Sequence, residues 1–350
     1  MTGHILAIES SCDETAIAIL RDDGEVLANK ISSQDEVHAR FGGVVPEIAA
    51  REHLTKIARL TQQALDEAEI SGNDLSAVAA TYGPGLIGPL MIGLQFAKGF
   101  AQALNLRFIG IHHIEGHLLA AKVDPHFPPA PFLALIASGG HSALYDYRGL
   151  GRIELVGETR DDAAGEAFDK IAKLLGLGYP GGRVIDERAA LGDPFKYPLP
   201  VSLKQKTVLD YSFSGLKTAV RILVEQLHQD GLNDSIINDV CASARRVIVE
   251  ALLNKAFLAL KARGLKKLIL GGGVAANSLL RSEALKRGKE ANVAVYLPPP
   301  ILCTDNAVMI ALVAQARLAQ GQCSDFKLGP QPGATAMDSD NAIKAETTFS

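Results

Sequence analysis

The chain has 350 residues, of which 47% are hydrophobic and 21% charged, which is typical of a folded globular protein and excludes a disordered one. Its 35 basic and 39 acidic residues give a net charge of −4, so any nucleic-acid contact must be local or shared with a partner. The four cysteines form no C-x-x-C pair, and no stretch is apolar enough to span a bilayer, so we expect a cytosolic protein.

The first part of the chain is expected to begin with a β-hairpin. Residues 4–9 and 16–20 read as strands, and the small polar turn Ser10-Ser-Cys-Asp-Glu-Thr15 between them presents hydroxyls and carboxylates. The predicted elements that follow are strands at 25–32, 75–82 and 107–111, and helices at 47–68, 88–104 and from about 113. This order is typical of an α/β fold.

The second part of the chain repeats this pattern. Strands are predicted at 131–137, 142–147, 152–157, 267–270 and 293–297, with helices from 276 and over 305–320. Two hairpin-led units in tandem predict a two-lobed fold with a cleft between the lobes. We expect an N-terminal lobe at 1–130, a C-terminal lobe at 131–322 with an insertion at about 176–233, and a disordered tail at 323–350.

A histidine pair follows the strand predicted at 107–111. His113 and His117 lie four positions apart in a run that is expected to be helical, so both imidazoles can reach one ion. His-x-x-x-His is half of the zinc-peptidase motif, which needs a glutamate directly after the first histidine. Here the carboxylate is Glu115, which is turned towards the opposite face of the helix. Two ordinary helix histidines remain an equally open interpretation.

Glycine-rich turns follow three of the predicted strands. Residues 83–88 match the spacing G-x-G-x-x-G, but no acidic residue lies between Asp74 and Glu115 to bind a ribose, so a tight turn before a helix is favoured over a dinucleotide site. The turns at 137–140 and 271–273 end apolar strands with bare N–H groups. Together with the turn at 10–15 they predict a phosphate site.

Asp305 precedes the last predicted helix. Its simplest use is to cap that helix. The alternative makes it a third metal ligand, and two histidines with one carboxylate leave coordination positions open for a substrate on iron or zinc. Spacing in the sequence does not decide between these two uses.

Several segments carry a family resemblance. They are Glu9-Ser-Ser-Cys-Asp-Glu-Thr-Ala16, His113-Ile-Glu-Gly-His117, Ala137-Ser-Gly-Gly-His141, Phe168-Asp-Lys-Ile-Ala-Lys-Leu-Leu-Gly-Leu-Gly-Tyr-Pro-Gly-Gly182, Phe213-Ser-Gly-Leu-Lys-Thr218 and Gly271-Gly-Gly-Val-Ala-Ala-Asn277. In this order, over roughly residues 5–321, the chain resembles the tRNA adenosine threonylcarbamoyltransferases. Proteins of this family were long described as O-sialoglycoprotein endopeptidases, an interpretation that the histidine pair invites.

The resemblance implies a fold and a set of site residues. The fold is the two-lobed α/β type of actin, Hsp70 and the sugar kinases. His113, His117 and Asp305 are implied to hold one divalent metal ion, with iron favoured and zinc as the alternative. Asp13 and Glu14 are implied to be needed for catalysis. The implied substrate site is lined by Ile136, Ala137, Ser138, Gly139, Gly140, Asp169, Gly182, Asp186 and Asn277.

The resemblance also implies an activity and partners. Family members transfer the threonylcarbamoyl group of L-threonylcarbamoyl-adenylate to the N6 amine of the tRNA adenosine just 3′ of the anticodon, in tRNAs that read codons beginning with adenine, and AMP is released. Bacterial members work with a catalytically inactive paralogue as heterodimer partner and a small P-loop ATPase, and no membrane is involved. The competing interpretations are a metal-dependent glycoprotein endopeptidase and an ATP-driven binding or chaperone module of the same fold type.

Two surface features bear on tRNA. Family members commonly close with a basic, aromatic-containing segment, whereas this chain closes with a small, polar tail, so a contact made by that segment would be altered here. The basic residues that are candidates for tRNA contacts, each more simply a solvated charge, are Lys204, Lys206, Lys217, Arg221, Arg245 and Arg246.

Overall fold

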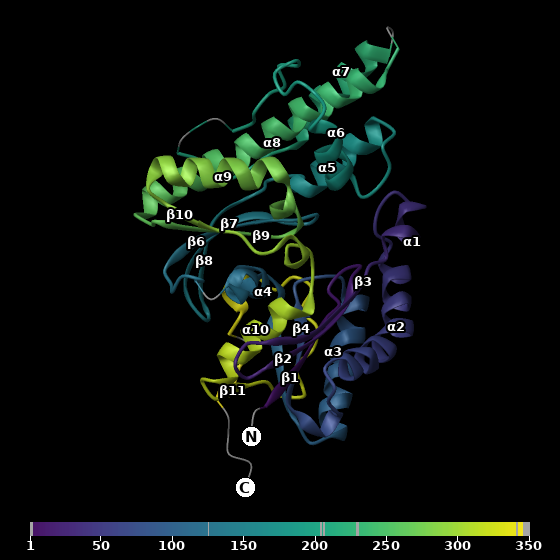
Figure 1. Cartoon of the computed structure of the whole chain (residues 1–350), viewed down its shortest axis with the longest axis vertical. Helices are drawn as coiled ribbons and strands as arrows, with labels where there is room; N and C mark the ends of the chain where they lie inside the picture. The colour runs from purple at the N-terminus through teal and green to yellow at the C-terminus, as the bar shows by residue number, and fades with distance from the viewer. Residues whose placement is uncertain are drawn as a thin grey trace. The chain divides into compact units, whose positions relative to one another are not determined.

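The computed structural model describes residues 3–124, 126–203, 205, 207–228, 231–340 and 342–345. The chain forms two compact units and is traced by colour in Figure 1. Unit 1 comprises Met1–Phe127, Leu150–Arg152 and Asp305–Ser350, and unit 2 comprises Pro128–Gly149 and Ile153–Thr304. Among the described residues, none of the helices combines the length and the apolar character needed to traverse a bilayer.

Unit 1 is built on a five-stranded sheet in the order β3-β2-β1-β4-β5. Its strands are β1 (His4–Glu9), β2 (Thr15–Arg21), β3 (Val26–Ser32), β4 (Leu75–Gly83) and β5 (Arg107–His112). Strand β2 runs antiparallel to β1 and β3, whereas β4 and β5 run parallel to β1. Strands β1, β2 and β4 are buried almost throughout, because helices cover both faces of the sheet.

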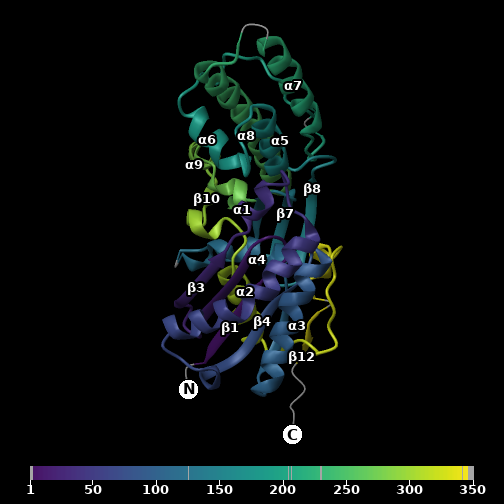
Figure 2. The ribbon, with the colours of Figure 1, turned by 90° about the vertical axis from the view of Figure 1, so that its right-hand side faces the viewer.

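The helices of unit 1 form the layers on either side of this sheet. Helices α2 (Pro46–Glu67) and α3 (Ile87–Ala103) pack together on one face, and α4 (His113–Leu119) and α10 (Ala307–Leu318) lie on the other, as Figures 1 and 2 show. In α2, Ile57, Leu60 and Ala64 recur at helical spacing and face the core. The smaller elements are α1 (Asp35–Ala39), η1 (Gly72–Asp74), η2 (Ala120–Val123), β11 (Gln322–Cys323), η5 (Ala336–Asp338) and β12 (Lys344–Ala345).

The segment after residue 304 returns to unit 1, which corrects two expectations. We expected residues 305–322 in the second lobe, but α10 packs against β1 and β2. We expected 323–350 to be disordered, which is wrong for its described residues, since Ser324 N donates to Phe108 O of β5 at 2.8 Å and β11 pairs with β12. Part of the tail is held by main-chain hydrogen bonds, which every residue type can form, so its polar composition was a poor guide.

Unit 2 repeats the topology of unit 1 with the strand order β10-β9-β6-β7-β8. Strand β7 is antiparallel to β6, and β9 is parallel to both β6 and β10. Its strands are β6 (Phe132–Ala137), β7 (Ser142–Gly149), β8 (Arg152–Glu158), β9 (Lys267–Gly271) and β10 (Ala294–Tyr296). The predicted tandem units and the two-lobed α/β fold class are therefore confirmed.

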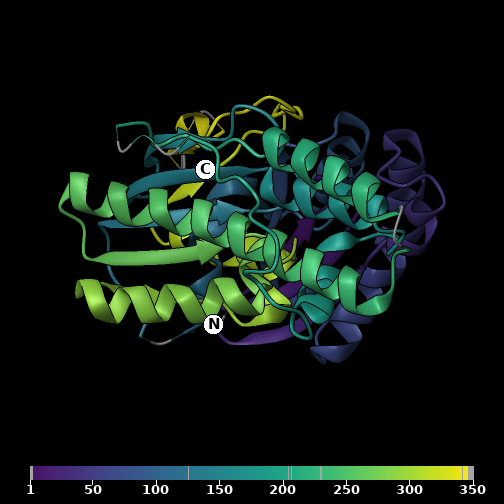
Figure 3. The same cartoon turned by 90° about the horizontal axis from the view of Figure 1, so that it is seen from above.

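The helices of unit 2 bury its core against this sheet. Phe168, Leu252 and Leu270 lie in one apolar cluster that joins α5, α8 and β9. Figure 3 shows α8 and α9 in green, side by side along the unit. The helical elements are α5 (Ala164–Leu174), α6 (Gly181–Ala189), α7 (Ser214–His228), α8 (Asp234–Arg263), η3 (Gly273–Ala276), α9 (Ser278–Ala291) and η4 (Pro300–Leu302). The segment expected as an insertion, 176–233, thus contains α6 and α7.

Candidate functional site

The carboxyl ends of β1, β4 and β5 share one edge of the unit 1 sheet, because these strands are parallel. Strand β1 ends at Glu9 and leads into the polar turn, and β5 ends at His112 directly before α4. Ligand sites of open α/β sheets form at this edge. Two groups of side chains with metal-binding chemistry include residues that follow these strand ends: His113, His117 and Asp305, and Asp13, Glu14 and Asp35.

His113, His117 and Asp305 form the first group, and the family resemblance had implied that these three residues lie together. Each offers one ligand atom, and these atoms lie within 4.8 Å of one another. His117 Nε2 lies 3.1 Å from Asp305 Oδ1, and His113 Nε2 lies 3.5 Å from the same oxygen. Helix α4 presents both rings on one face, with their centroids 4.7 Å apart. Two imidazole nitrogens and one carboxylate oxygen that converge in this way could hold a metal ion.

Glu9 orients the ring of His113 by contacting Nδ1, the ring nitrogen other than the one near Asp305. Its Oε2 lies 3.1 Å from His113 Nδ1, and Ser11 Oγ lies 3.2 Å from the same nitrogen. A hydrogen on Nδ1 that is donated to Glu9 leaves the lone pair of Nε2 directed towards Asp305. A carboxylate behind the histidine is the usual environment of a metal-ligating imidazole, so the surroundings of His113 fit the metal assignment.

The charges around His113 favour a cation in this place. Burial lowers the pKa of His113, but the carboxylates of Asp305 and Glu9 outweigh burial and raise it to about 9. Burial likewise opposes ionisation of Glu9, yet His113 holds the pKa of Glu9 below its usual value. Two carboxylates therefore surround one imidazolium, and a divalent ion can replace its proton.

Glu115 takes no part in this group. Its carboxylate forms a buried, bidentate ion pair with Arg317 of α10, in which Nη2 lies 2.7 Å and Nε 2.9 Å from Oε2. The predicted direction of Glu115, away from the histidine face, is therefore confirmed. A carboxylate engaged with Arg317 cannot take a proton from a metal-bound water, so the peptidase interpretation lacks its general base.

Asp13, Glu14 and Asp35 form the second group at this edge. Their ligand oxygens lie within 4.8 Å of one another. Burial and the charges of Asp13 and Asp305 raise the pKa of Glu14 well above its ordinary value. Glu14 therefore retains a proton more readily than a free carboxyl does.

The glycine-rich loop 83–88 supports this turn, in agreement with the tight-turn interpretation. Leu86 N donates to Ser11 O at 2.8 Å. A Cβ added to Gly85, whose φ is +153°, would lie 2.5 Å from that oxygen. The glycine thus allows two main-chain segments to touch, and the loop needs no dinucleotide to explain its composition.

The residues predicted to bind substrate all lie in unit 2. Ile136 and Ala137 end β6, and Ser138 begins the turn that follows. A Cβ at Gly272, whose φ is +83°, would lie 2.3 Å from Ala137 O, so the two glycine-rich turns adjoin. Apart from the glycine itself and its two chain neighbours, no described atom lies within 4 Å of the place where a Cβ of Gly139 or Gly140 would be. Their main chain is open enough for a ligand to approach closely.

The remaining predicted residues of unit 2 are linked by hydrogen bonds. Asp169 of α5 accepts from Gly181 N at 2.7 Å, at the start of the helix that carries Gly182 and Asp186. Asp186 Oδ1 accepts from Asn277 Nδ2 at 2.9 Å. The structure thus brings Asp186 and Asn277 together and ties Asp169 to the same helix.

Asp186 and Asn277 also organise the start of α9. Ser278 N donates to Asp186 Oδ2 at 3.0 Å, and Arg245 Nη1 donates to Oδ1 at 2.8 Å. Asn277 Oδ1 accepts from Leu280 N at 3.1 Å, which caps the helix. Both residues therefore have structural roles besides any role in binding.

The basic residues considered for tRNA contact give little support to one surface. Arg245 is held by Asp186, and Arg246 Nε donates to Pro194 O at 2.8 Å. Lys204 and Lys206 lie outside the described residues.

Sequence reasoning missed Glu9, Ser11, Asp35 and His53 as parts of this region. The sequence held a signal for Glu9, because this charged residue ends a strand in which residues 5–8 are all apolar. The sequence held no such signal for His53 of α2, because only the folded chain brings it to the polar turn. There His53 Nε2 lies 3.0 Å from Cys12 O.

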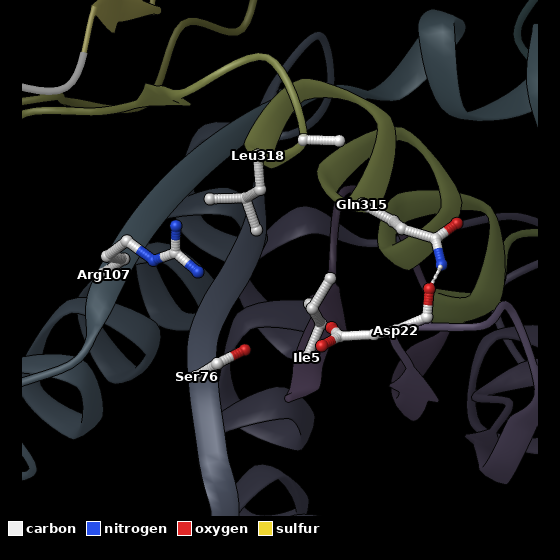
Figure 4. A pocket seen from close by; sticks show the side chains of 7 residues that line it. Ile5, Asp22, Ser76, Arg107, Gln315 and Leu318 are labelled. Atoms are coloured by element: carbon white, nitrogen blue, oxygen red, sulfur yellow. Dashed lines mark hydrogen bonds between the residues drawn. The ribbon is translucent and has the colours of Figure 1, made fainter. Parts of the chain in front are cut away.

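A pocket of about 260 Å³ lies at the opposite edge of the unit 1 sheet. Ile5, Ser76 and Arg107 line it near the starts of β1, β4 and β5, away from the carboxyl ends of these strands. Figure 4 shows Arg107 on one side, and Gln315 with Asp22 on the other, where Gln315 Nε2 donates to Asp22 O at 2.9 Å. This pocket is separate from both groups of candidate residues.

The fold and the two groups define the class of protein. The chain is a two-lobed α/β protein of the actin, Hsp70 and sugar-kinase type, and a group of two histidines and one aspartate that could hold a metal ion lies at the carboxyl-end edge of its first sheet. The crystal structure of component A of (R)-2-hydroxyglutaryl-CoA dehydratase from Acidaminococcus fermentans shares the fold, with a TM-score of 0.54, 17% identity, and coverage of 91% of this chain and 99% of that chain.

Sequence comparison gives the family. The family model described as tRNA N6-adenosine threonylcarbamoyltransferase matches residues 25–312. A protein of that name from Clostridium perfringens is 46% identical over 94% of this chain and 96% of its own length. One from Trichlorobacter lovleyi is 48% identical over 92% of this chain and 93% of its own length. The chain belongs to the tRNA N6-adenosine threonylcarbamoyltransferase family.

Proposed function

We propose that this protein is an acyltransferase that moves a threonylcarbamoyl group from L-threonylcarbamoyl-adenylate to the N6 amine of a tRNA adenosine, with release of AMP. The acceptor is the adenosine 3′ to the anticodon in tRNAs that read codons beginning with adenine. The observation that carries the proposal is the convergence of His113, His117 and Asp305, with Glu9 behind His113, in a chain of this family.

The first group is proposed to hold one divalent metal ion, Fe²⁺ in preference to Zn²⁺. Imidazole nitrogens with one carboxylate suit both ions, and three protein ligands leave positions open. When bound, the ion would supply a Lewis acid for oxygens of the threonylcarbamoyl group and the phosphate. Glu9 and Ser11 keep the ring of His113 in the orientation that this role requires.

The donor needs no protein nucleophile, because a mixed anhydride already carries a good leaving group. The enzyme must orient the adenine amine against the carbamoyl carbon and stabilise the charge that grows on the departing phosphate. Asp13 is our candidate for the group that takes the proton from the amine. The raised pKa of Glu14 supports this division of roles, since the protonated Glu14 carboxyl can donate to the reacting group.

The adenylate part is proposed to bind in unit 2. The open main chain at Gly139 and Gly140 supports a role in phosphate or ribose binding, together with Ile136, Ala137 and Ser138. Asp169, Gly182, Asp186 and Asn277 are the proposed polar contacts of the nucleoside. Since Asn277 and Asp186 already fix each other, they would meet the ligand with little loss of side-chain freedom.

We propose that the reaction takes place in the cytosol with tRNA, an inactive paralogue as heterodimer partner and a small P-loop ATPase. The net charge of −4 supports a division of tRNA binding among several chains.

A reconstituted reaction tests the proposal. The purified chain, a paralogue and ATPase of the stated kind, the adenylate donor and unmodified tRNA are incubated together, and digested tRNA is examined by mass spectrometry. The expected product is threonylcarbamoyladenosine, absent when the chain or the donor is omitted. A complete mixture that never yields this nucleoside would contradict the proposal. Incubation with glycoproteins, with and without chelator, tests the peptidase alternative, for which we expect no cleavage.

A further inference from the structure

The histidine helix is too short to fix its own direction. Helix α4 spans seven residues, about two turns, and an isolated helix of this length is not stable in water. Its packing against α10 is close, because a Cβ at Gly116 would lie 3.1 Å from side-chain atoms of Ile310 and Met309. The direction of His113 and His117 must therefore be set by the elements that hold α4 in place.

The polar link that holds α4 is the ion pair between Glu115 and Arg317. Both side chains are buried, with 0% and 1% of their surfaces exposed. Arg317 is in the last turn of α10, and Asp305 precedes the first turn of the same helix. The first turn of α10 thus follows the candidate ligand Asp305. Arg317, in its last turn, binds Glu115 of the helix that supplies the two histidines.

The C-terminal tail completes this link. Arg317 Nη1 donates to Asp340 Oδ1 at 2.9 Å, and Nη2 is 3.4 Å from Ser339 O. Asp340 is closely confined, since a Cβ at Gly151 would fall 1.9 Å from its Oδ2. Gly151 N is in turn 3.3 Å from Glu115 Oε1. Tail, α10 and α4 are joined in one hydrogen-bonded network.

We propose that Arg317, held by the tail residue Asp340, is a positioning residue that sets the direction of α4 and thereby the spacing of the metal-ligand atoms. The guanidinium of arginine suits this role, because its fixed fork engages Glu115 in two places and still leaves Nη1 for Asp340. Without the tail contact, Arg317 keeps Glu115 and its 3.2 Å contact with Gln322 Oε1, but it loses the carboxylate that anchors its Nη1 to the tail. Helix α4 then gains freedom, and its histidines fit one ion less well. The inference rests on the metal site of the proposed function.

Asp340→Ala tests the inference, because it removes the oxygen that accepts from Arg317, and Asp325→Ala is the matched control. Asp340 is 58% exposed, so its replacement leaves the core intact. Asp325 lies in the same tail, where it pairs with Lys344 at 2.9 Å and accepts from Lys327 N at 2.7 Å. Zn²⁺ affinity is measured by competition with a chromophoric chelator, and the ligand geometry by the d–d absorption of the Co²⁺-loaded protein. We expect Asp340→Ala to bind Zn²⁺ about tenfold more weakly and to change the Co²⁺ spectrum, with Asp325→Ala unchanged in both.

The outcomes separate this inference from the proposed function. If the unaltered protein binds Zn²⁺ and Asp340→Ala retains the same affinity and Co²⁺ spectrum, the positioning role of the tail is overturned while the metal site stands. If the unaltered protein binds neither ion, the metal site itself is wrong and the positioning role fails with it. Arg317→Lys provides a second variant, with an expected loss larger than that of Asp340→Ala, because lysine cannot make the bidentate contact with Glu115.

Discussion

His53 Nδ1 lies 2.7 Å from Thr15 Oγ1, and the other nitrogen of the same buried ring lies 3.0 Å from Cys12 O. The imidazole therefore joins both ends of the segment that carries Asp13 and Glu14. Burial lowers the pKa of His53, so the neutral ring accepts from the threonine hydroxyl and donates to the carbonyl. Oxygens of Asp13, Glu14 and Asp35 lie within 4.8 Å of one another, so His53 holds the main chain that carries two of these three carboxyl groups.

His53→Ala is expected to destabilise the protein and to disorder this turn. The change leaves the Thr15 hydroxyl and the Cys12 carbonyl buried without their partner, which costs about 2–3 kcal/mol in free energy of unfolding. Urea denaturation measures this loss, and His126→Ala, whose side chain is 90% exposed, is the control. An unchanged denaturation midpoint for His53→Ala would show that the ring does not hold the turn.

Removal of single metal ligands is expected to abolish tight binding of the ion. His113→Ala and Asp305→Ala each reduce the ligand set from three to two, so bound metal should fall well below one ion per chain after gel filtration. Elemental analysis of the purified variants measures the content. Asp124→Ala, an exposed carboxylate, should retain the metal of the unaltered chain. Full metal content in Asp305→Ala would remove Asp305 from the ligand set.

Metal uptake is expected to release a proton and to strengthen as the pH rises. Asp305 and Glu9 outweigh burial and raise the pKa of His113 to about 9. The proton on His113 stabilises the metal-free fold: this contribution is full below the ordinary pKa of 6.5 and is lost as the pH rises through about 9. Since a ligand imidazole must be neutral, apparent Zn²⁺ affinity should rise by about tenfold per pH unit between about 7 and 9.

Calorimetry in two buffers of different ionisation enthalpy measures this linkage. At a pH of about 7.5 the heats should differ by the equivalent of about one proton released per ion bound. Glu9→Gln removes one of the two carboxylates that hold the proton, so its proton release should be smaller. Identical heats in both buffers for the unaltered protein would exclude a protonated His113 in the metal-free state.

Substitutions at Asn277 are expected to separate capping from ligand binding. Asn277→Ala removes the cap of α9 and should lower the free energy of unfolding by about 1 kcal/mol. Asn277→Ser keeps a capping oxygen but loses the amide that donates to Asp186. We expect Asn277→Ser to retain most of the stability yet to bind AMP more weakly, as measured by calorimetry. Equal AMP affinity in Asn277→Ser and the unaltered chain would restrict Asn277 to its structural role.

The secondary structure and the tandem repeat could be read from the sequence because they follow from local periodicity. Strand β1 was predicted with the bounds that the structure has, and the pair His113 and His117 was predicted to share a helix face. Local spacing also placed Glu115 on the opposite face. Each of these features depends on neighbours within a few positions, which periodicity reports directly.

Contacts between residues that lie far apart in the sequence could not be predicted in the same way. Nothing local pairs Glu115 with Arg317, which lies some two hundred positions later, or brings His53 to Cys12. The sequence left Asp305 with two interpretations, as a helix cap or as a metal ligand. Only the fold shows that its carboxylate lies beside His117. The C-terminal tail was misjudged for the same reason, since both the main chain and the hydroxyl of Ser324 bond to β5, at residues more than two hundred positions earlier.

The return of the chain to unit 1 has a consequence for biosynthesis. Unit 2 is complete once the ribosome has added Thr304, whereas unit 1 still lacks the helix that covers one face of its sheet. Domains fold as units while the chain emerges, so unit 2 can fold first although unit 1 begins the sequence. His113 and His117 leave the ribosome long before Asp305 and Arg317. The nascent chain therefore cannot bring His113, His117 and Asp305 together until unit 2 has been synthesised, so the proposed metal site forms only after that point.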